Sequence, residues 1–127
     1  MRLAHSIQHE VLVIRLEGSL AAWEILEIGT QLKDLITNSN NMVVMDLTQV
    51  DQIDAAGIGV LTECHRRLTE RGSNLLLAGA KGPAANAIRM AQLSEFMQLA
   101  MSVDQAITMA APTVEIDPDK LLDDNEP

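Results

Sequence analysis

The sequence predicts an α/β domain in which a mixed, mainly parallel sheet of four to five strands is packed by about four helices. Short apolar runs typical of strands alternate along the chain with longer segments of helical periodicity. The run Met42–Met45 is continuously apolar, as expected for a strand that helices cover in a parallel sheet. The length of 127 residues fits one domain with its own core.

The first part of the chain predicts a hairpin followed by a helix. Residues 10–17 alternate two largely apolar faces and predict a strand, and residues 4–9 predict a weaker partner strand at the sheet edge. Gly18 is expected to break the second strand. Apolar residues then return at spacings of three and four from Leu20 to Ile36, which predicts a helix, and the polar run 37–41 ends it.

The middle of the chain predicts a third strand, a second helix and a fourth strand. The apolar run Met42–Met45 predicts the third strand, and residues 46–50 continue it outward. The next helix is expected from Ala56 to about Arg71. Gly72 suits the C-terminal end of that helix, because glycine adopts positive φ without a steric penalty. The apolar run 75–79 then predicts another buried strand.

The last part predicts two helices with a short strand between them. Pro83 stands near the first position of a helix that extends to about Ala91. Residues 96–101 predict a short strand, and the capping-box spacing at 102–105 predicts a terminal helix to about Ala110. The domain is therefore expected at residues 3–111, and residues 112–127 are expected to form an acidic, disordered tail.

Composition and charge exclude several classes of protein. The net charge of −9 argues against a nucleic-acid binder, which needs a basic face. Residues 115–127 hold six acids and one lysine and so carry −5 of this charge; the alternative to a solvated tail is an acidic arm for a basic partner. One cysteine and no run that suits a signal peptide or a membrane span predict a cytoplasmic protein without direct membrane insertion.

The residues that usually carry catalysis or bind metals do not form a recognisable set. The three histidines His5, His9 and His65 are scattered; His5 and His9 could share a strand face, but no cysteine or carboxylate lies at ligand spacing beside those two. Cys64 and His65 are neighbours on a predicted helix, where consecutive side chains point about 100° apart, so they do not form a dyad. We therefore expect no enzyme activity, no metal and no cofactor.

The turn between the third strand and the second helix is the most informative segment. Asp54 stands where the helix needs an N-cap acceptor. Gly57 and Gly59 fall in the first turn, where glycine is unfavourable unless the sheet or a partner approaches closely. We interpret this turn as a docking surface, and assign partner binding to Thr48, Asp51, Asp54, Ala55, Ala56, Gly57, Ile58 and Gly59.

Residues 43–61 resemble the central motif of STAS domains, the family of anti-sigma-factor antagonists and of the C-terminal parts of sulfate transporters. The shared pattern is an apolar strand, then Asp46-Leu47-Thr48, then Ile53-Asp54-Ala55-Ala56-Gly57-Ile58-Gly59 opening a helix. The likeness extends more weakly over about residues 5–111. It implies a STAS-like fold and binding to a protein partner, either an anti-sigma factor that is also a serine kinase or a signalling scaffold.

The resemblance also implies where regulation would act. In classical antagonists the partner kinase phosphorylates a serine just before the first glycine of this motif, and the phosphate breaks or remakes the complex. That position is Ala56 here, the position before it is Ala55, and the polar residue common after Gly-x-Leu is replaced by Ala21. Because alanine has no hydroxyl, we interpret the chain as an interaction module without the usual switch; the alternative moves the phosphosite to Thr48 or Thr62.

Two further functions remain open from the sequence. The chain could be the STAS subunit of a transporter complex, or it could sense a nucleotide or another anion at the helix N-terminus. Against anion sensing, no lysine or arginine is near the turn in sequence, and Asp51 and Asp54 would repel phosphate. The sequence also leaves a homodimer open.

Overall fold

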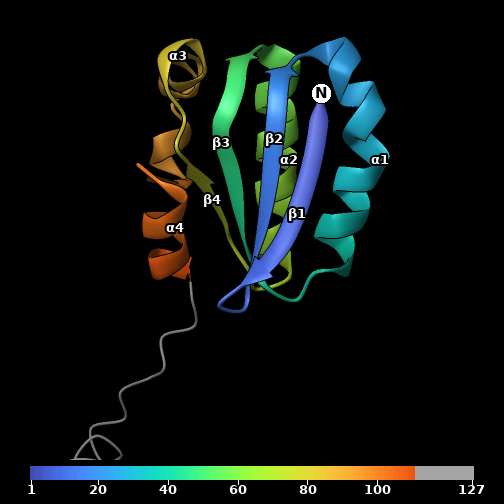
Figure 1. The fold of residues 1–127 in the computed structure, drawn as a ribbon, viewed down its shortest axis with the longest axis vertical. Helices are drawn as coiled ribbons and strands as arrows, with labels where there is room; N and C mark the ends of the chain where they lie inside the picture. The colour runs from blue at the N-terminus through green and yellow to red at the C-terminus, as the bar shows by residue number, and fades with distance from the viewer. Residues whose placement is uncertain (111–127) are drawn as a thin grey trace, which may run out of the picture.

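A computed structural model describes residues 1–110, which form one five-stranded sheet with helices on both of its faces (Figure 1). The strand order is β1-β2-β3-β4-β5; β1 is antiparallel to β2, and the other neighbouring pairs are parallel. The predicted fold class is confirmed, while the tail predicted at 112–127 lies outside the described residues. In chain order the elements are β1 (Arg2–Gln8), β2 (Val11–Leu20), α1 (Ala22–Asn38), β3 (Met42–Ile53), α2 (Ala55–Glu70), β4 (Leu75–Ala78), α3 (Gly82–Met90), the 3-10 turn η1 (Leu93–Glu95), β5 (Gln98–Ala100) and α4 (Val103–Ala110).

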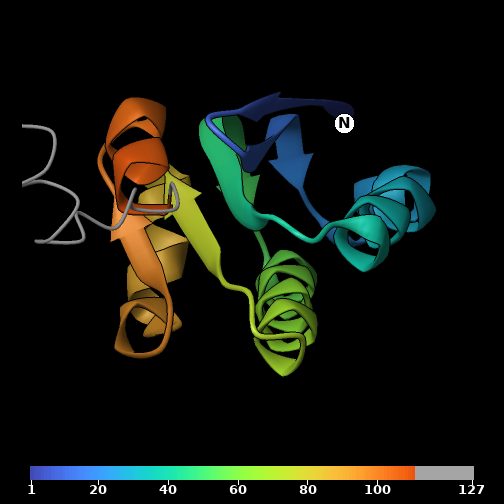
Figure 2. The same cartoon turned by 90° about the horizontal axis from the view of Figure 1, so that it is seen from below.

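Helices α1, α2 and α3 lie on one face of the sheet, and α4 lies on the other (Figure 2). Each of the first three helices joins neighbouring parallel strands in the same direction across the sheet, so right-handed crossovers place all three on one side. The larger core lies on this side and is aliphatic, as the low aromatic content requires. The smaller core packs α4 against β2, β3 and β4.

Two strands run further than the sequence predicts. The prediction that Gly18 breaks the strand is wrong: β2 continues to Leu20, and its register with β3 shifts between Gly18 and Ser19. Gly18 takes φ 115°, so the glycine permits an irregularity inside the strand and does not end it. Because Leu20 pairs with Ile53, β3 also continues past the predicted end of the strand, and both strands reach the start of α2.

Several local predictions about the ends of helices are confirmed. Gly72 follows α2 with φ 77°, and the Ser73 N–H donates to the Leu68 carbonyl at 2.8 Å. Ser102 caps α4 by accepting from the Gln105 N–H at 3.1 Å. The reciprocal bond is displaced, because the Gln105 side chain accepts from the N–H of residue 101 at 2.7 Å. No helix within residues 1–110 is long and apolar enough to cross a membrane.

Candidate functional site

The turn at the start of α2 is held by one carboxylate. Asp54 Oδ1 accepts the N–H of Gly57 at 2.9 Å, which confirms the predicted N-cap. Asp54 Oδ2 accepts the N–H of Ala22, the first residue of α1, at 3.1 Å. The Asp54 N–H itself donates to the Leu20 carbonyl at 3.2 Å. Asp54 therefore ties the N-termini of α1 and α2 together at the ends of β2 and β3.

These bonds also set the electrostatics of the turn. The N–H groups of Gly57 and Ala22 stabilise the charged carboxylate and lower the pKa of Asp54 below its ordinary value. The hydrogen bond from Gly57 makes the largest contribution, and the one from Ala22 makes the next largest. The positive ends of two helix dipoles act in the same direction. Because Asp54 already takes up these donors, the arrangement disfavours an external anion at the same place.

The lowered pKa of Asp54 predicts a pH dependence of stability. The contribution of this carboxylate is complete above its unfolded-state pKa, whose ordinary value is 3.8, and it is lost as the pH falls through the folded-state pKa. We expect the urea midpoint of the wild-type chain to fall more steeply below about pH 4 than that of Asp54→Asn. If the urea midpoints of the two chains fell in parallel from pH 7 to pH 2.5, this role would be contradicted. The other carboxylates lower the midpoint equally in both chains, so they do not affect the comparison.

The two glycines of the turn have different surroundings. A Cβ at Gly57 would lie 2.2 Å from the Leu20 carbonyl oxygen and 2.8 Å from Ile53 Cγ2, so only glycine lets α2 pack this closely against the strand ends. A Cβ at Gly59 would meet no heavy atom within 4 Å. Close packing against the sheet therefore explains Gly57, whereas no neighbour within the described part of the chain requires glycine at position 59.

Most of the predicted docking residues are brought together on the surface. Ala55, Ala56 and Gly59 are exposed at the start of α2, and Asp51 and Asp54 are exposed beside them. Gly57 is buried and Ile58 is half-buried, so these two predicted residues support the turn from within. The result is a small surface at the start of α2 in which the exposed alanines carry no reactive group.

The two threonines proposed as alternative phosphosites lie in different environments. Thr48 is half-buried in β3, and its hydroxyl donates to Oδ1 of the buried Asp46 at 2.6 Å. Thr62 is exposed on α2, and its hydroxyl donates to the Ile58 carbonyl at 2.9 Å. Thr48 is thus engaged in the fold, while Thr62 lies on the outer surface of α2.

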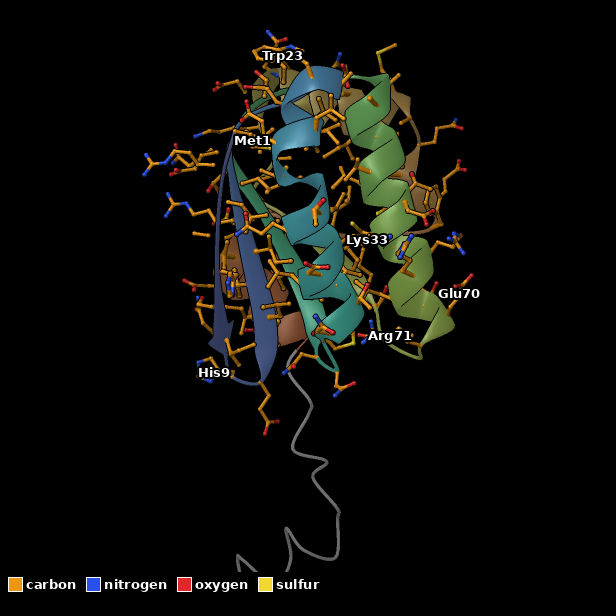
Figure 3. The ribbon with its side chains drawn as sticks, turned by 90° about the vertical axis from the view of Figure 1, so that its right-hand side faces the viewer. Met1, His9, Trp23, Lys33, Glu70 and Arg71 are labelled. Carbon is orange, nitrogen blue, oxygen red and sulfur yellow. The ribbon has the colours of Figure 1, made fainter. Side chains whose placement is uncertain are left out.

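Sequence reasoning missed two exposed apolar residues near this end of the molecule. Trp23 is 70% exposed and Leu26 is 84% exposed, both in the first part of α1. Figure 3 shows Trp23 at the end of the molecule where α1 and α2 begin. A signal was present, because neither residue falls on the helix stripe that is buried against the sheet, formed by Ile28, Leu32 and Ile36.

Cys64 is buried and His65 is half-buried, whereas His5 and His9 are exposed. Within residues 1–110, no three His, Cys, Asp or Glu side chains are placed to hold a metal ion. The ring of His65 packs edge-on against Phe96, with centroids 5.7 Å apart. Burial raises the pKa of the Cys64 thiol to about 12, so this cysteine is a poor nucleophile.

Comparison with known proteins gives a consistent family. The model of the STAS domain family matches residues 3–106. An anti-sigma factor antagonist from Mycobacterium paratuberculosis has a similar structure, with a TM-score of 0.80, 19% identity, and coverage of 87% of this chain and 94% of the other. The Bacillus cell fate determinant SpoIIAA, in its phosphorylated form, gives 0.64 at 18% identity, covering 85% and 98%. A sulfate transporter family protein from Wolinella succinogenes gives 0.69 at 20% identity, covering 83% and 88%.

Proposed function

Because this chain belongs to the STAS domain family, we propose that it is a protein-binding module of the anti-sigma-factor-antagonist type. Its partner is an anti-sigma factor or a signalling scaffold in the bacterial cytoplasm, and it docks through the exposed start of α2. The observation that carries this proposal is the pair Ala55 and Ala56, exposed on a turn that Asp54 fixes to α1. A rigid surface of small side chains lets a partner approach closely, and the surface itself has little conformational entropy to lose on binding.

We further propose that this docking is not switched by phosphorylation at the usual place. The family resemblance puts the phosphoacceptor at position 56, where alanine has no hydroxyl. SpoIIAA is a relative whose structure is known in a phosphorylated form. In this chain the same position stays uncharged, so the complex is expected to persist whether or not a kinase is active. If a phosphosite has moved, the exposed Thr62 is better placed than Thr48.

The proposed function is binding and not catalysis. Ala55 and Ala56 offer no nucleophile, acid or base. The neighbouring Asp54 carboxylate is already bonded to two backbone N–H groups. A second candidate is a STAS subunit of a transporter complex, which the likeness to the Wolinella succinogenes protein favours. Both candidates use the same surface, so the identity of the bound protein distinguishes them.

The test places a charge in the proposed contact. A photo-crosslinking amino acid at position 56 captures the partner in cells, mass spectrometry identifies it, and the purified pair is then titrated. Ala56→Asp is expected to raise the Kd at least about tenfold, because an unpaired carboxylate would be buried against the partner. An acid in the first turn suits the helix dipole, so folding should be retained.

The matched control is Ala4→Asp, which places the same charge on an exposed alanine of β1. It is expected to leave the Kd unchanged. Equal affinity of the wild-type and Ala56→Asp chains would show that the partner docks elsewhere.

A further inference from the structure

A groove runs between α1 and α2, and no side chain of the described residues fills it. Its volume is about 140 Å³, and its walls include Gly29 and Lys33 of α1 and Val60 and Arg67 of α2. A Cβ at Gly29 would meet no heavy atom within 4 Å. Figure 3 shows α1 and α2 side by side, with Lys33 lying between them. The groove is therefore a surface hollow beside a glycine.

An exposed leucine stands next to this hollow. Leu26 is 84% exposed and precedes Gly29 by three residues, so both lie on one stripe of α1. Trp23 is 70% exposed one turn before Leu26, and Lys33 is exposed about one turn after Gly29. Leu26, the hollow beside Gly29 and Lys33 thus share one stripe, and Trp23 flanks it at the N-terminal end, about 120° around the helix from Gly29.

We propose that this stripe is the interface of a homodimer in which the α1 helices of two copies cross antiparallel about a twofold axis between Leu26 and Gly29. In a twofold contact, if one residue meets a second, then the second also meets the first. A projection and a hollow three residues apart on one stripe satisfy this condition: Leu26 enters the groove beside Gly29 of the partner subunit, and the partner's Leu26 enters the other groove. The groove is of the scale of the roughly 150 Å³ cavity that takes up a benzene ring, which is enough for a leucine side chain.

The same symmetry gives the outer residues of the stripe a partner. Under the axis between Leu26 and Gly29, Trp23 faces position 32 of the second copy. Lys33 of the partner subunit is one residue further along, about 1.5 Å of helix rise, so its long side chain can bring the ammonium to the indole face. Antiparallel crossing also sets the two helix dipoles in opposite directions, which is favourable. The absence of a side chain at Gly29 lets the two backbones approach.

The dimer does not depend on the docking function. The α2 helix runs in the same direction as α1, so the Ala55–Ala56 turns lie at opposite ends of the pair (Figure 3). The dimer is measured on the purified chain alone, whereas docking is measured with its partner. Either proposal can therefore fail without the other.

The test measures the mass of the full chain by sedimentation equilibrium from micromolar to millimolar concentration. The wild-type chain is expected to reach twice its 13.8 kDa. Leu26→Asp removes the projection and Gly29→Leu fills the hollow, and each is expected to raise the dimer Kd by at least about 30-fold. Met101→Asp is the matched control, because Met101 is 88% exposed between β5 and α4, next to the sheet edge opposite β1, and it should leave the Kd unchanged. Far-ultraviolet circular dichroism checks the fold of each variant.

Trp23 provides a second readout, because it is the only tryptophan of the chain. Its emission is expected to shift to longer wavelength when the wild-type dimer is diluted, and to start there in Leu26→Asp. A wild-type chain that stays monomeric at millimolar concentration overturns the proposal. A dimer that persists in both Leu26→Asp and Gly29→Leu, or one that Met101→Asp also dissociates, overturns it as well. The proposal is also overturned if the chain is a monomer that binds a different protein through this stripe of α1.

Discussion

Replacing Gly57 by alanine is expected to lower the free energy of unfolding by about 3 kcal/mol, at the upper end of the range for overpacking. The new Cβ would lie 2.2 Å from the Leu20 carbonyl oxygen, which belongs to the backbone of β2. A flexible side chain could move aside. The Leu20 backbone is paired with Ile53 of β3, so it can move only together with that strand. The start of α2 must then shift away from the sheet, which also strains the Asp54 bond to Ala22.

Gly59→Ala is the matched control for this effect. It lies two residues further along the same helix, and its Cβ would meet no heavy atom within 4 Å. This change is expected to raise the free energy of unfolding by about 0.5–1 kcal/mol, because alanine is the better helix residue. Urea unfolding at neutral pH measures both variants. Similar values for the two variants would show that the close approach of Gly57 to Leu20 is not what sets its identity.

The contrast between these glycines shows where sequence reasoning ends. In the sequence they look alike, since each stands in the first turns of a predicted helix. Sequence reasoning expected the second strand to end at Gly18, so it could not place the Leu20 carbonyl against Gly57. The irregular pairing of β2 with β3 carries the strand to Leu20, and this pairing is a property of two segments that are distant in the chain.

Local features of the site were predictable for the opposite reason. The bond from the Gly57 N–H to Asp54 spans three residues, so the residue types at those positions were sufficient. The second bond of Asp54, to the N–H of Ala22, spans 32 residues and follows only from the arrangement of the two helices. The exposure of Trp23 was missed, although its position outside the apolar stripe was a sufficient signal; the groove beside Gly29, in contrast, requires α2 as its other wall.

Thr48 has a structural role that the sequence did not predict. Sequence reasoning assigned it to partner binding, and in the structure it lies in the middle of β3 and packs against Gly79, the residue after β4. Its hydroxyl donates to Asp46, and its methyl group occupies the place where a Cβ at Gly79 would be, 2.2 Å from Thr48 Cγ2. Gly79 also takes φ 73°, a conformation that side chains disfavour.

Gly79→Ala is therefore expected to lower the free energy of unfolding by about 2–3 kcal/mol, of which about 1 kcal/mol comes from the positive φ and the rest from the contact with Thr48. Rotating the threonine away would break its bond to Asp46, so the clash cannot be relieved without loss. Thr48→Ser removes the methyl group and keeps the hydroxyl. In the double variant the clash should disappear while the backbone strain remains.

A double-mutant cycle of Gly79→Ala and Thr48→Ser, followed by urea unfolding, separates the two causes. The double variant is expected to be more stable than the sum of the single effects by about 1 kcal/mol or more. Strict additivity would mean that backbone strain alone explains the glycine, and that the Thr48 methyl group is free to move. A positive coupling would instead establish that the Thr48 methyl group packs against Gly79.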